Sequence, residues 1–302
     1  MDRLQAMTVF VRVVESGSFS AAARLMHLGQ PAVSKAVAQL ERQLGVQLLL
    51  RSAHGLTPTD AGQRYFERVA RIVSDAEDAD AAARDSTLSL QGRLRVAVPT
   101  TFGRIQIVPR LGDFLKEHPR LKMDIELDDR RVDLVAEGID VAIRVGPLND
   151  STMIAKRLAR GRRSILATPR YLEQSLALET PEDLALHQAV TYARDDGGRY
   201  VFHQQGRDVS TTLSPRLNLS AAEGIRAAVL ADLGLTIAAD WMFLPELECG
   251  TVVRCLTDWS LPPVDLWVVY PSGRLTSAKA RAFSDFVAGV VGELETVSRS
   301  MC

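Results

Sequence analysis

The chain is poor in cysteine and in long apolar runs, and each scarcity argues against a class of protein. Its 302 residues include three cysteines, Cys249, Cys255 and Cys302, without CxxC spacing, which argues against a disulfide framework and a zinc site. No stretch approaches the ~20 apolar residues of a membrane-spanning helix, and no signal peptide is recognisable. We therefore expect a cytoplasmic protein with no membrane association, no metal and no cofactor.

Sequence motifs of common catalytic sites are also missing. The chain has no GxSxG elbow, Walker loop or GxGxxG turn, and no paired Cys or His residues at metal-ligand spacing. The five histidines are scattered along the chain at His27, His54, His118, His187 and His203. We do not expect an enzyme, which stays the first alternative to the function developed below.

The charges are balanced in total but unevenly distributed. The formal net charge is −1, yet residues 1–71 hold nine Lys and Arg against five Asp and Glu. Residues 72–85 then hold five acidic residues and one basic residue, Arg84. A length of 302 residues indicates two or three units, and a basic head before an acidic stretch is typical of a small DNA-binding module on a neutral body.

The first 45 residues predict three short helices. Apolar residues recur at helical spacing from Leu4, and Ser16–Ser18 ends the first helix and begins the second. His27–Gly29 forms a short turn, Pro31 suits the first turn of a third helix, and Gly45 ends it. This pattern fits a helix-turn-helix, although a three-helix bundle with no DNA role has the same pattern.

The third predicted helix has one apolar and one small, polar side. Val33, Val37, Leu40 and Leu44 have 4-3-4 spacing and should face the core. Small residues on the opposite side permit close approach to the major groove, Gln can pair with adenine, and Ser and Lys can reach bases or phosphates. The residues on this side are Gln30, Pro31, Ser34, Lys35 and Ala38.

A predicted strand at Leu48–Arg51 and a hairpin turn at Ser52–Thr57 follow the third helix. Such a hairpin is typical of a wing beside a recognition helix. Arg51 and His54 on it would lie near the flanking backbone or minor groove of DNA.

Several segments of the first 62 residues have the order and spacing of a known family: Phe19–Ala23, Gln30–Ser34, Leu40–Glu41, Leu44–Val46, Arg51 and Thr59–Gly62. Over roughly sixty residues without a gap they closely resemble the LysR-type transcriptional regulators. Gly29 departs from the usual Ser or Thr, and Leu49 from the usual Phe. The resemblance implies an N-terminal winged helix-turn-helix, mainly α, whose DNA contacts come from Gln30, Pro31, Ser34, Lys35 and Arg51.

A long helix capped by Thr59 is predicted to run to about Leu88. Apolar residues follow coiled-coil spacing and favour a dimer seam, with packing against the same chain as the alternative. A dimer places two DNA-binding heads on half-sites ~34 Å apart. In LysR-type regulators this helix is the dimerisation and linker element. The seam residues are Tyr65, Val69, Ile72, Ala76, Ala79 and Ala83.

Beyond residue 92 strands and helices alternate, which predicts a parallel-rich α/β sheet. This region resembles the LysR effector domain, with Gly92–Val96, Glu137–Arg144, Gly234–Ile237 and Tyr270–Ser272 carrying the likeness. The resemblance implies two α/β lobes around a cleft, like type 2 periplasmic binding proteins. The predicted domains are 1–59 for DNA binding, 60–91 for dimerisation and 92–302 for effector binding, with lobe one at 92–161 and 266–295 and lobe two at 162–265.

Ligands in such folds bind beyond the carboxyl ends of strands. Thr100, Thr101 and Phe102 stand between a strand and a helix start, where free N–H groups favour an anion; an N-cap role for either Thr is the alternative. Ser220 opens a second helix in a Ser220–Glu223 capping box. Arg144 and Thr191 complete the predicted effector site, and the expected effector is an organic acid.

The sequence thus predicts a bacterial transcription regulator that binds double-stranded operator DNA and is switched by a small-molecule effector. Effector binding would shift the placement of subunits, and thereby half-site spacing, DNA bend and contact with RNA polymerase. The resemblance implies a homodimer or a homotetramer built from two dimers. An architectural DNA-binding protein without a sensing role is the second alternative, and a two-lobed body argues against it.

Overall fold

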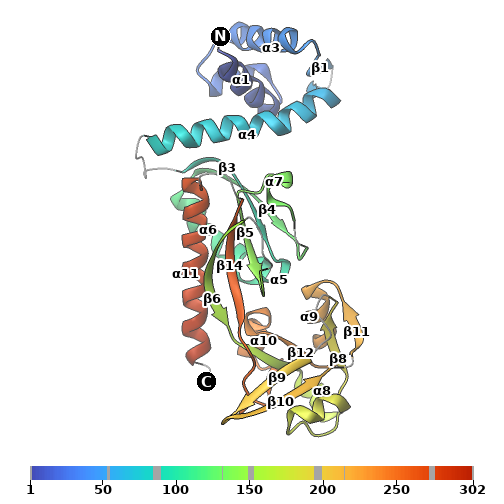
Figure 1. The fold of residues 1–302 in the computed structure, drawn as a ribbon. Helices are drawn as coiled ribbons and strands as arrows, with labels where there is room; N and C mark the ends of the chain where they lie inside the picture. Colours follow the sequence, from blue (N-terminus) through green and yellow to red (C-terminus); the bar gives the residue numbers. More distant parts are fainter. Residues whose placement is uncertain are drawn as a thin grey trace. The chain divides into compact units, whose positions relative to one another are not determined.

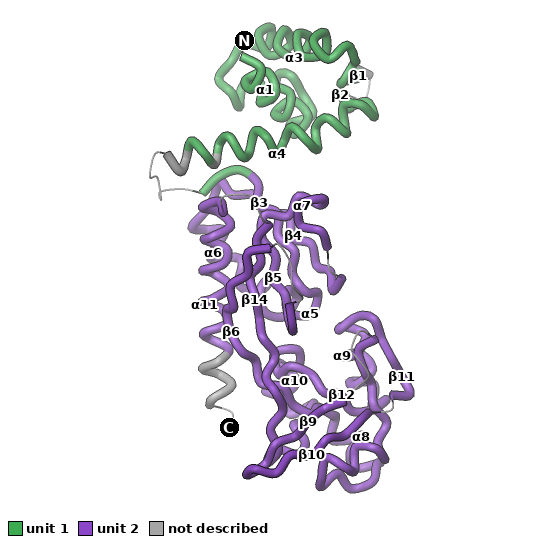
Figure 2. The backbone as a smooth tube through the Cα atoms, in the orientation of Figure 1, with its two compact units in different colours: residues 1–92 green, residues 93–302 purple. Residues whose placement is uncertain are grey.

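The computed structural model describes residues 2–52, 55–83, 90–130, 132–148, 153–193, 199–213, 215–271 and 276–300. The chain divides into two compact units, Met1–Gly92 and Arg93–Cys302, which Figure 2 shows in different colours. Among the described residues, no helix is long and apolar enough to span a bilayer.

The described residues of unit 1 form four helices and a hairpin: α1 Arg3–Ser16, α2 Phe19–Leu25, α3 Gln30–Leu44, β1 Leu49–Ser52, β2 Gly55–Pro58 and α4 Asp60–Ala83. Helices α1 and α3 end at Gly17 and Gly45, whose φ angles of +64° and +66° favour glycine. The Ser18 side chain accepts a hydrogen bond from the Ala21 N–H and caps α2. The three predicted helices and a hairpin after them are therefore confirmed. The turn is shorter than predicted, because Ser52 and residues 55–57 pair in the two strands.

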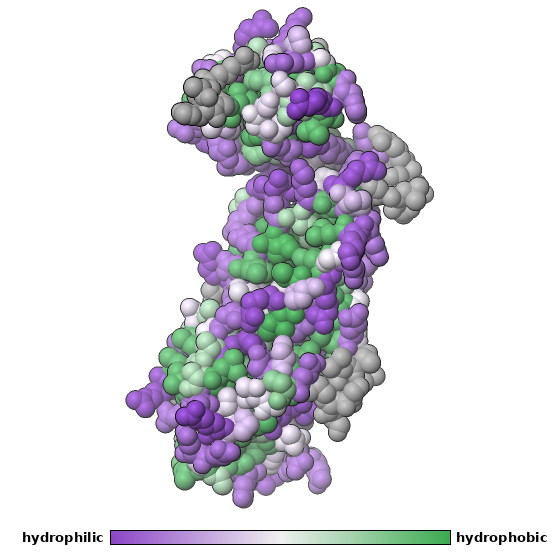
Figure 3. Space-filling view, turned by 180° about the vertical axis from the view of Figure 1, so that it is seen from behind, coloured by the Kyte–Doolittle hydropathy of each residue, from purple (hydrophilic) through white to green (hydrophobic). Residues whose placement is uncertain are grey.

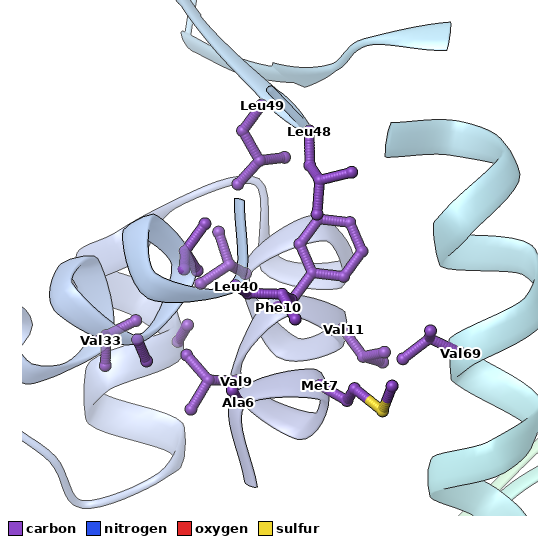
Figure 4. Close-up of a cluster of buried hydrophobic side chains, with 14 of the residues drawn as sticks. Ala6, Met7, Val9, Phe10, Val11, Val33, Leu40, Leu48, Leu49 and Val69 are labelled. Atoms are coloured by element: carbon purple, nitrogen blue, oxygen red, sulfur yellow. The ribbon is translucent and has the colours of Figure 1, made fainter. Parts of the chain in front are cut away.

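The core of unit 1 lies where α1, α3 and α4 meet the first strand. Phe10 of α1 and Leu40 of α3 are fully buried, and Leu48 leaves 1% of its surface exposed. In Figure 4 these three side chains point toward one another, and Val69 of α4 reaches Val11 from the other side. Burial of these residues fixes the rotation of α3 about its own axis, so that its other side faces outward.

Unit 2 contains a five-stranded sheet in lobe one, ordered β4-β3-β5-β14-β6. Its strands are β3 Gln91–Val98, β4 Arg120–Leu127, β5 Val141–Val145, β6 Ile154–Gly161 and β14 Val264–Tyr270. β3 and β5 are parallel, but β14 runs antiparallel to both β5 and β6. Strands β3, β5 and β6 therefore run in one direction, as the predicted parallel-rich sheet requires, and β14, which returns from lobe two, runs in the opposite direction.

Helices cover the sheet of lobe one. A continuous helical run comprises α5 Thr100–Phe102, a π-helical turn Gly103–Ile107, a 3-10 turn Val108–Arg110 and α6 Leu111–Glu117. The others are α7 Leu134–Glu137 and α11 Ala278–Ser300, which lies alongside the sheet in Figure 1. The Phe114 ring of α6 packs against Phe286 of α11 with 5.0 Å between ring centroids.

Lobe two begins after Arg162 and is built on β12-β7-β13, with two further strand pairs. Alternate residues of β7 pack on opposite sides: Ile165 belongs to one buried cluster and Leu166 to another, so both faces are covered. The chain returns at Val264, two residues before the predicted boundary. The elements are β7 Arg163–Ala167, α8 Pro169–Glu173, a 3-10 helix Pro181–Leu186, β8 Ala189–Tyr192, β9 Arg199–Gln204, β10 Arg207–Thr212, β11 Pro215–Leu219, α9 Ala222–Leu230, β12 Thr236–Ala239, a 3-10 helix Asp240–Met242, α10 Leu244–Glu248 and β13 Val253–Cys255.

Candidate functional site

The predicted DNA-facing side of α3 is on the outside of unit 1, and we call it the α3 flank: Gln30, Pro31, Ser34, Lys35 and Ala38. Gln30, Pro31, Lys35 and Ala38 are exposed and Ser34 is half-buried. Gly29, at the N-cap, provides no side-chain hydrogen bond to the helix start. The flank thus presents one amide, one hydroxyl and one ammonium group on a small-residue background, which suits a helix that enters the major groove.

The wing is held to α3 by a contact that sequence reasoning missed. Oε1 of Glu41 accepts hydrogen bonds from the backbone N–H groups of Leu48 and Leu49, at 2.7 and 3.1 Å. In the hairpin, Arg51 pairs with Leu56. The Arg51 side chain and all of His54 lie outside the described part of the chain, so their predicted DNA contacts stay predictions.

Thr59 joins the wing to α4. Its hydroxyl accepts a hydrogen bond from the Gly62 N–H at 2.9 Å and donates one to the Gln47 carbonyl oxygen at 2.8 Å. The predicted cap is confirmed. A larger residue does not fit at position 62, because a Cβ there would lie 1.9 Å from the Leu48 carbonyl oxygen.

The predicted seam of α4 divides between two environments. Val69 is buried and Tyr65 half-buried in the core of unit 1, where the Tyr65 ring lies 5.5 Å from that of Phe10. Ile72 is 48% exposed and Ala79 is exposed. The first part of the seam therefore packs on its own chain, and the second part presents apolar surface.

The predicted effector residues Thr100–Phe102 lie at the start of the helical run in lobe one. The Thr100 N–H donates to Oδ1 of Asp129 at 2.9 Å. Thr101 is 2% exposed, and its Oγ1 has no hydrogen-bond partner among the described residues. Phe102, also 2% exposed, packs edge-on against Trp241 of lobe two, with ring centroids 5.8 Å apart. Both side chains are therefore closed to solvent in this structure.

The predicted capping box at Ser220 does not form. Helix α9 begins at Ala222, its N-cap is Ala221, and Ser220 is exposed outside the helix. Oδ2 of Asp129 instead accepts a hydrogen bond from the Ala222 N–H at 3.0 Å. A carboxylate from lobe one thus does what the hydroxyl was expected to do, because the chain places Asp129 directly against this helix start.

The two remaining predicted effector residues bind other parts of the protein. Arg144 donates to the backbone carbonyl oxygens of Arg130 and Val132, at 2.9 and 3.2 Å. Thr191 is 7% exposed, and its hydroxyl donates to Oδ1 of Asn218 on the neighbouring strand at 3.4 Å. The structure thus brings Thr100, Thr101 and Phe102 together with the start of α9. The side chains of Arg144 and Thr191 are instead hydrogen-bonded to other residues of their own lobes.

Comparison with known proteins decides the family. Residues 4–63 match the family described as bacterial regulatory helix-turn-helix protein, lysR family, and residues 88–291 match the LysR substrate binding domain. The chain belongs to the LysR family of transcriptional regulators. It is accordingly a DNA-binding transcription regulator with an effector-binding domain.

Relatives of this LysR-family chain match it along most of its length. It is 34% identical to an HTH-type transcriptional regulator of Xanthomonas campestris pv. campestris, over 92% of this chain and 83% of that protein. The structure of CrgA, a LysR-type regulator from Neisseria meningitidis, is 29% identical with a TM-score of 0.60, over 95% of this chain and 98% of CrgA. Full-length AphB, a Vibrio cholerae virulence activator, is 27% identical with a TM-score of 0.57, over 95% and 99%.

The LysR effector domain also holds a cavity of about 290 Å³ that sequence reasoning did not predict. It lies in lobe two, and its lining includes Arg163, Phe202, Cys255 and Trp259 but none of the predicted effector residues. Its lining comes from β7, from Phe202 of β9 and from residues 255–261, which are far apart in the sequence and carry no local signal of a cavity.

We expect the two described cysteines of this regulator to react very differently. Burial raises the pKa of the Cys255 thiol to about 11, whereas a hydrogen bond with Thr251 lowers the pKa of exposed Cys249 below its ordinary value. Because the thiolate is the reactive form, Cys249 should alkylate at least about 100-fold faster between pH 7 and 9. Iodoacetamide labelling followed by peptide mass spectrometry measures both rates. Equal rates would contradict the assignment of burial to Cys255.

Proposed function

We propose that this regulator binds a specific operator by inserting the α3 flank into the major groove. The observation that carries the proposal is the position of Gln30, Ser34 and Lys35 on the outward side of a helix whose other side is buried. Gln offers a bidentate pairing with adenine, and Ser and Lys offer contacts to bases or phosphates. Arg51 and His54 on the wing would contact the flanking backbone or minor groove.

The effector, in this proposal, is a small organic acid bound between the lobes, near Thr100, Thr101, Phe102 and the segment that contains Ser220. What supports an acid is the chemistry already found there: two backbone N–H groups, one from each lobe, donate to a single carboxylate. Arg144 and Thr191 were predicted as further contacts, and reaching a ligand would require them to leave their present partners.

We further propose that the chain acts as a homodimer or homotetramer and contacts RNA polymerase when bound to the operator. Exposed apolar residues on α4, Ile72 foremost, support a helix–helix contact between two copies. On the face shown in Figure 3, apolar residues also gather on the surface of unit 2 among polar ones. The proposal includes the predicted domains, 1–59 for DNA binding, 60–91 for dimerisation and 92–302 for effector binding. It assigns no catalytic role to the chain.

Footprinting of the purified full-length chain on fragments of its own genome tests the function directly. We expect protection of one or a few sites with two half-sites about one helical turn apart, which persists with excess random DNA at physiological salt. Protection without sequence preference would instead support the architectural alternative. Adding a panel of small carboxylates to the same footprints tests the effector, because an acid that shifts the protected pattern identifies its class.

A further inference from the structure

Asp129 joins the two lobes with both oxygens of its carboxylate. The residue follows β4 in lobe one, where Oδ1 accepts from the Thr100 N–H at 2.9 Å and Oδ2 accepts from the Ala222 N–H of lobe two at 3.0 Å. Each oxygen thus accepts from the first residue of a helical segment, α5 in one lobe and α9 in the other. Backbone N–H groups at helix starts are the natural partners of a carboxylate.

A second interlobe contact reinforces the first. Arg104, four residues after Thr100, donates through Nε and Nη2 to both carboxylate oxygens of Glu223, at 3.1 and 3.0 Å. Glu223 directly follows Ala222 on α9, so the two contacts join the same pair of helical segments. A third interlobe hydrogen bond joins buried Gln106 of lobe one, whose Nε2 donates, to the Trp241 carbonyl oxygen of lobe two at 3.0 Å.

We propose that Asp129 is an internal substitute for the carboxylate of the effector: it holds the lobes together without a ligand, and an acid effector acts by displacing it. This inference rests on the proposed function above, since it specifies how the effector acts. Asp129 occupies the position where the helix starts would accept an acid. A free acid must therefore compete with a carboxylate that is tethered at high effective concentration.

This competition sets requirements for the effector. A simple monocarboxylate offers the two N–H groups nothing that Asp129 does not already provide, so the unmodified protein should bind acetate or formate poorly. A successful effector needs further groups that gain contacts as Asp129 leaves. Thr101 directly follows Thr100, and its hydroxyl is buried without a hydrogen-bond partner among the described residues. Opening of the lobes would make this hydroxyl available to an effector.

Replacing Asp129 and supplying a free carboxylate tests the proposal in the full-length chain. All three tryptophans, Trp241, Trp259 and Trp267, belong to unit 2, so tryptophan fluorescence follows its thermal unfolding. Loss of two charge-assisted hydrogen bonds in D129A should lower this melting temperature by about 4–8 °C. Acetate and formate, but not acetamide or chloride at equal ionic strength, should restore it.

Matched variants make the test specific. D113A removes an exposed carboxylate that pairs with Lys116 on the surface of the same unit, and it should neither destabilise comparably nor respond to acetate. D129N keeps one acceptor without the charge, so it should melt between D129A and the unmodified chain and show a weaker acetate effect. If D129A fails to fold, D129N supplies the same comparison. The acetate concentration for half-maximal stabilisation should be at least about tenfold lower in D129A than in the unmodified chain.

Two results would overturn the proposal: melting of D129A and D129N at the temperature of the unmodified chain, or equal stabilisation by acetate and chloride. Either result can be distinguished from a failure of the proposed function. Acetate rescue of D129A in a protein that no acid regulates would leave the interlobe contact established and refute the acid effector. Absence of a specific footprint would refute operator binding while leaving the Asp129 measurements unaffected.

Discussion

Replacing both Gln30 and Lys35 with alanine should weaken operator binding by about 30- to 1000-fold. A bidentate contact to a base edge contributes about 1–3 kcal/mol of discrimination, and a lysine contact adds to it, so the pair removes roughly 2–4 kcal/mol. Both side chains are exposed, and the substitutions therefore remove DNA contacts without opening the core. Fluorescence anisotropy with operator and random duplexes at one fixed salt concentration measures the change.

The control for this double variant lies on the same helix. Gln43 is also exposed, but its place in the helical repeat is away from the α3 flank, so Q43A should bind the operator as the unmodified chain does. Circular dichroism should show unchanged helix content in both variants. Equal loss of affinity in Q43A, or loss on operator and random DNA alike, would show that the α3 flank does not read sequence.

Substituting Phe10 with alanine should strongly destabilise unit 1 and leave unit 2 intact. Phe10 is fully buried where α1, α3 and the wing strand meet, and truncating such a side chain costs about 3–5 kcal/mol. Small domains are stable by only about 5–15 kcal/mol, so this loss removes much of what holds a unit of this size together. Operator binding should be lost at a lower temperature than in the unmodified chain, while the tryptophan melting transition, which reports on unit 2, should stay at the same temperature.

L25A is the matched control for F10A, because Leu25 is an apolar residue of the same unit with 68% of its surface exposed. The free energy of unfolding of unit 1, measured by far-ultraviolet circular dichroism, should stay within about 0.5 kcal/mol of that of the unmodified chain. If F10A instead lowered the tryptophan transition, the two units would not unfold independently.

The sequence predicts unit 1 well because its signals are local. Ser18, Gly17 and Gly45 set the ends of helices within a few residues of themselves, and Leu40 buries the predicted side of α3. Each of these effects depends on backbone chemistry that acts over one helical turn. The chain order of strands and helices in unit 2 was predictable for the same reason.

The interlobe surface was less predictable because long-range contacts decide it. Ser220 has the local signature of a cap, yet the start of α9 is served by Asp129, 93 residues earlier in the chain. The pairing of Arg104 with Glu223 spans 119 residues. No local pattern distinguishes Asp129 from any other surface aspartate, so its role emerges only when the two lobes are seen packed together.

Strand β14 has a consequence for how the protein is made. It lies between β5 and β6 and pairs with both, so these two strands of lobe one have no common neighbour until residue 270 leaves the ribosome. Lobe two, encoded in between, is complete earlier and can fold first. During synthesis the first part of the effector domain therefore has unpaired strand edges until β14 has been made. A nascent chain stalled before Val264 should be the form most prone to aggregation and to chaperone binding.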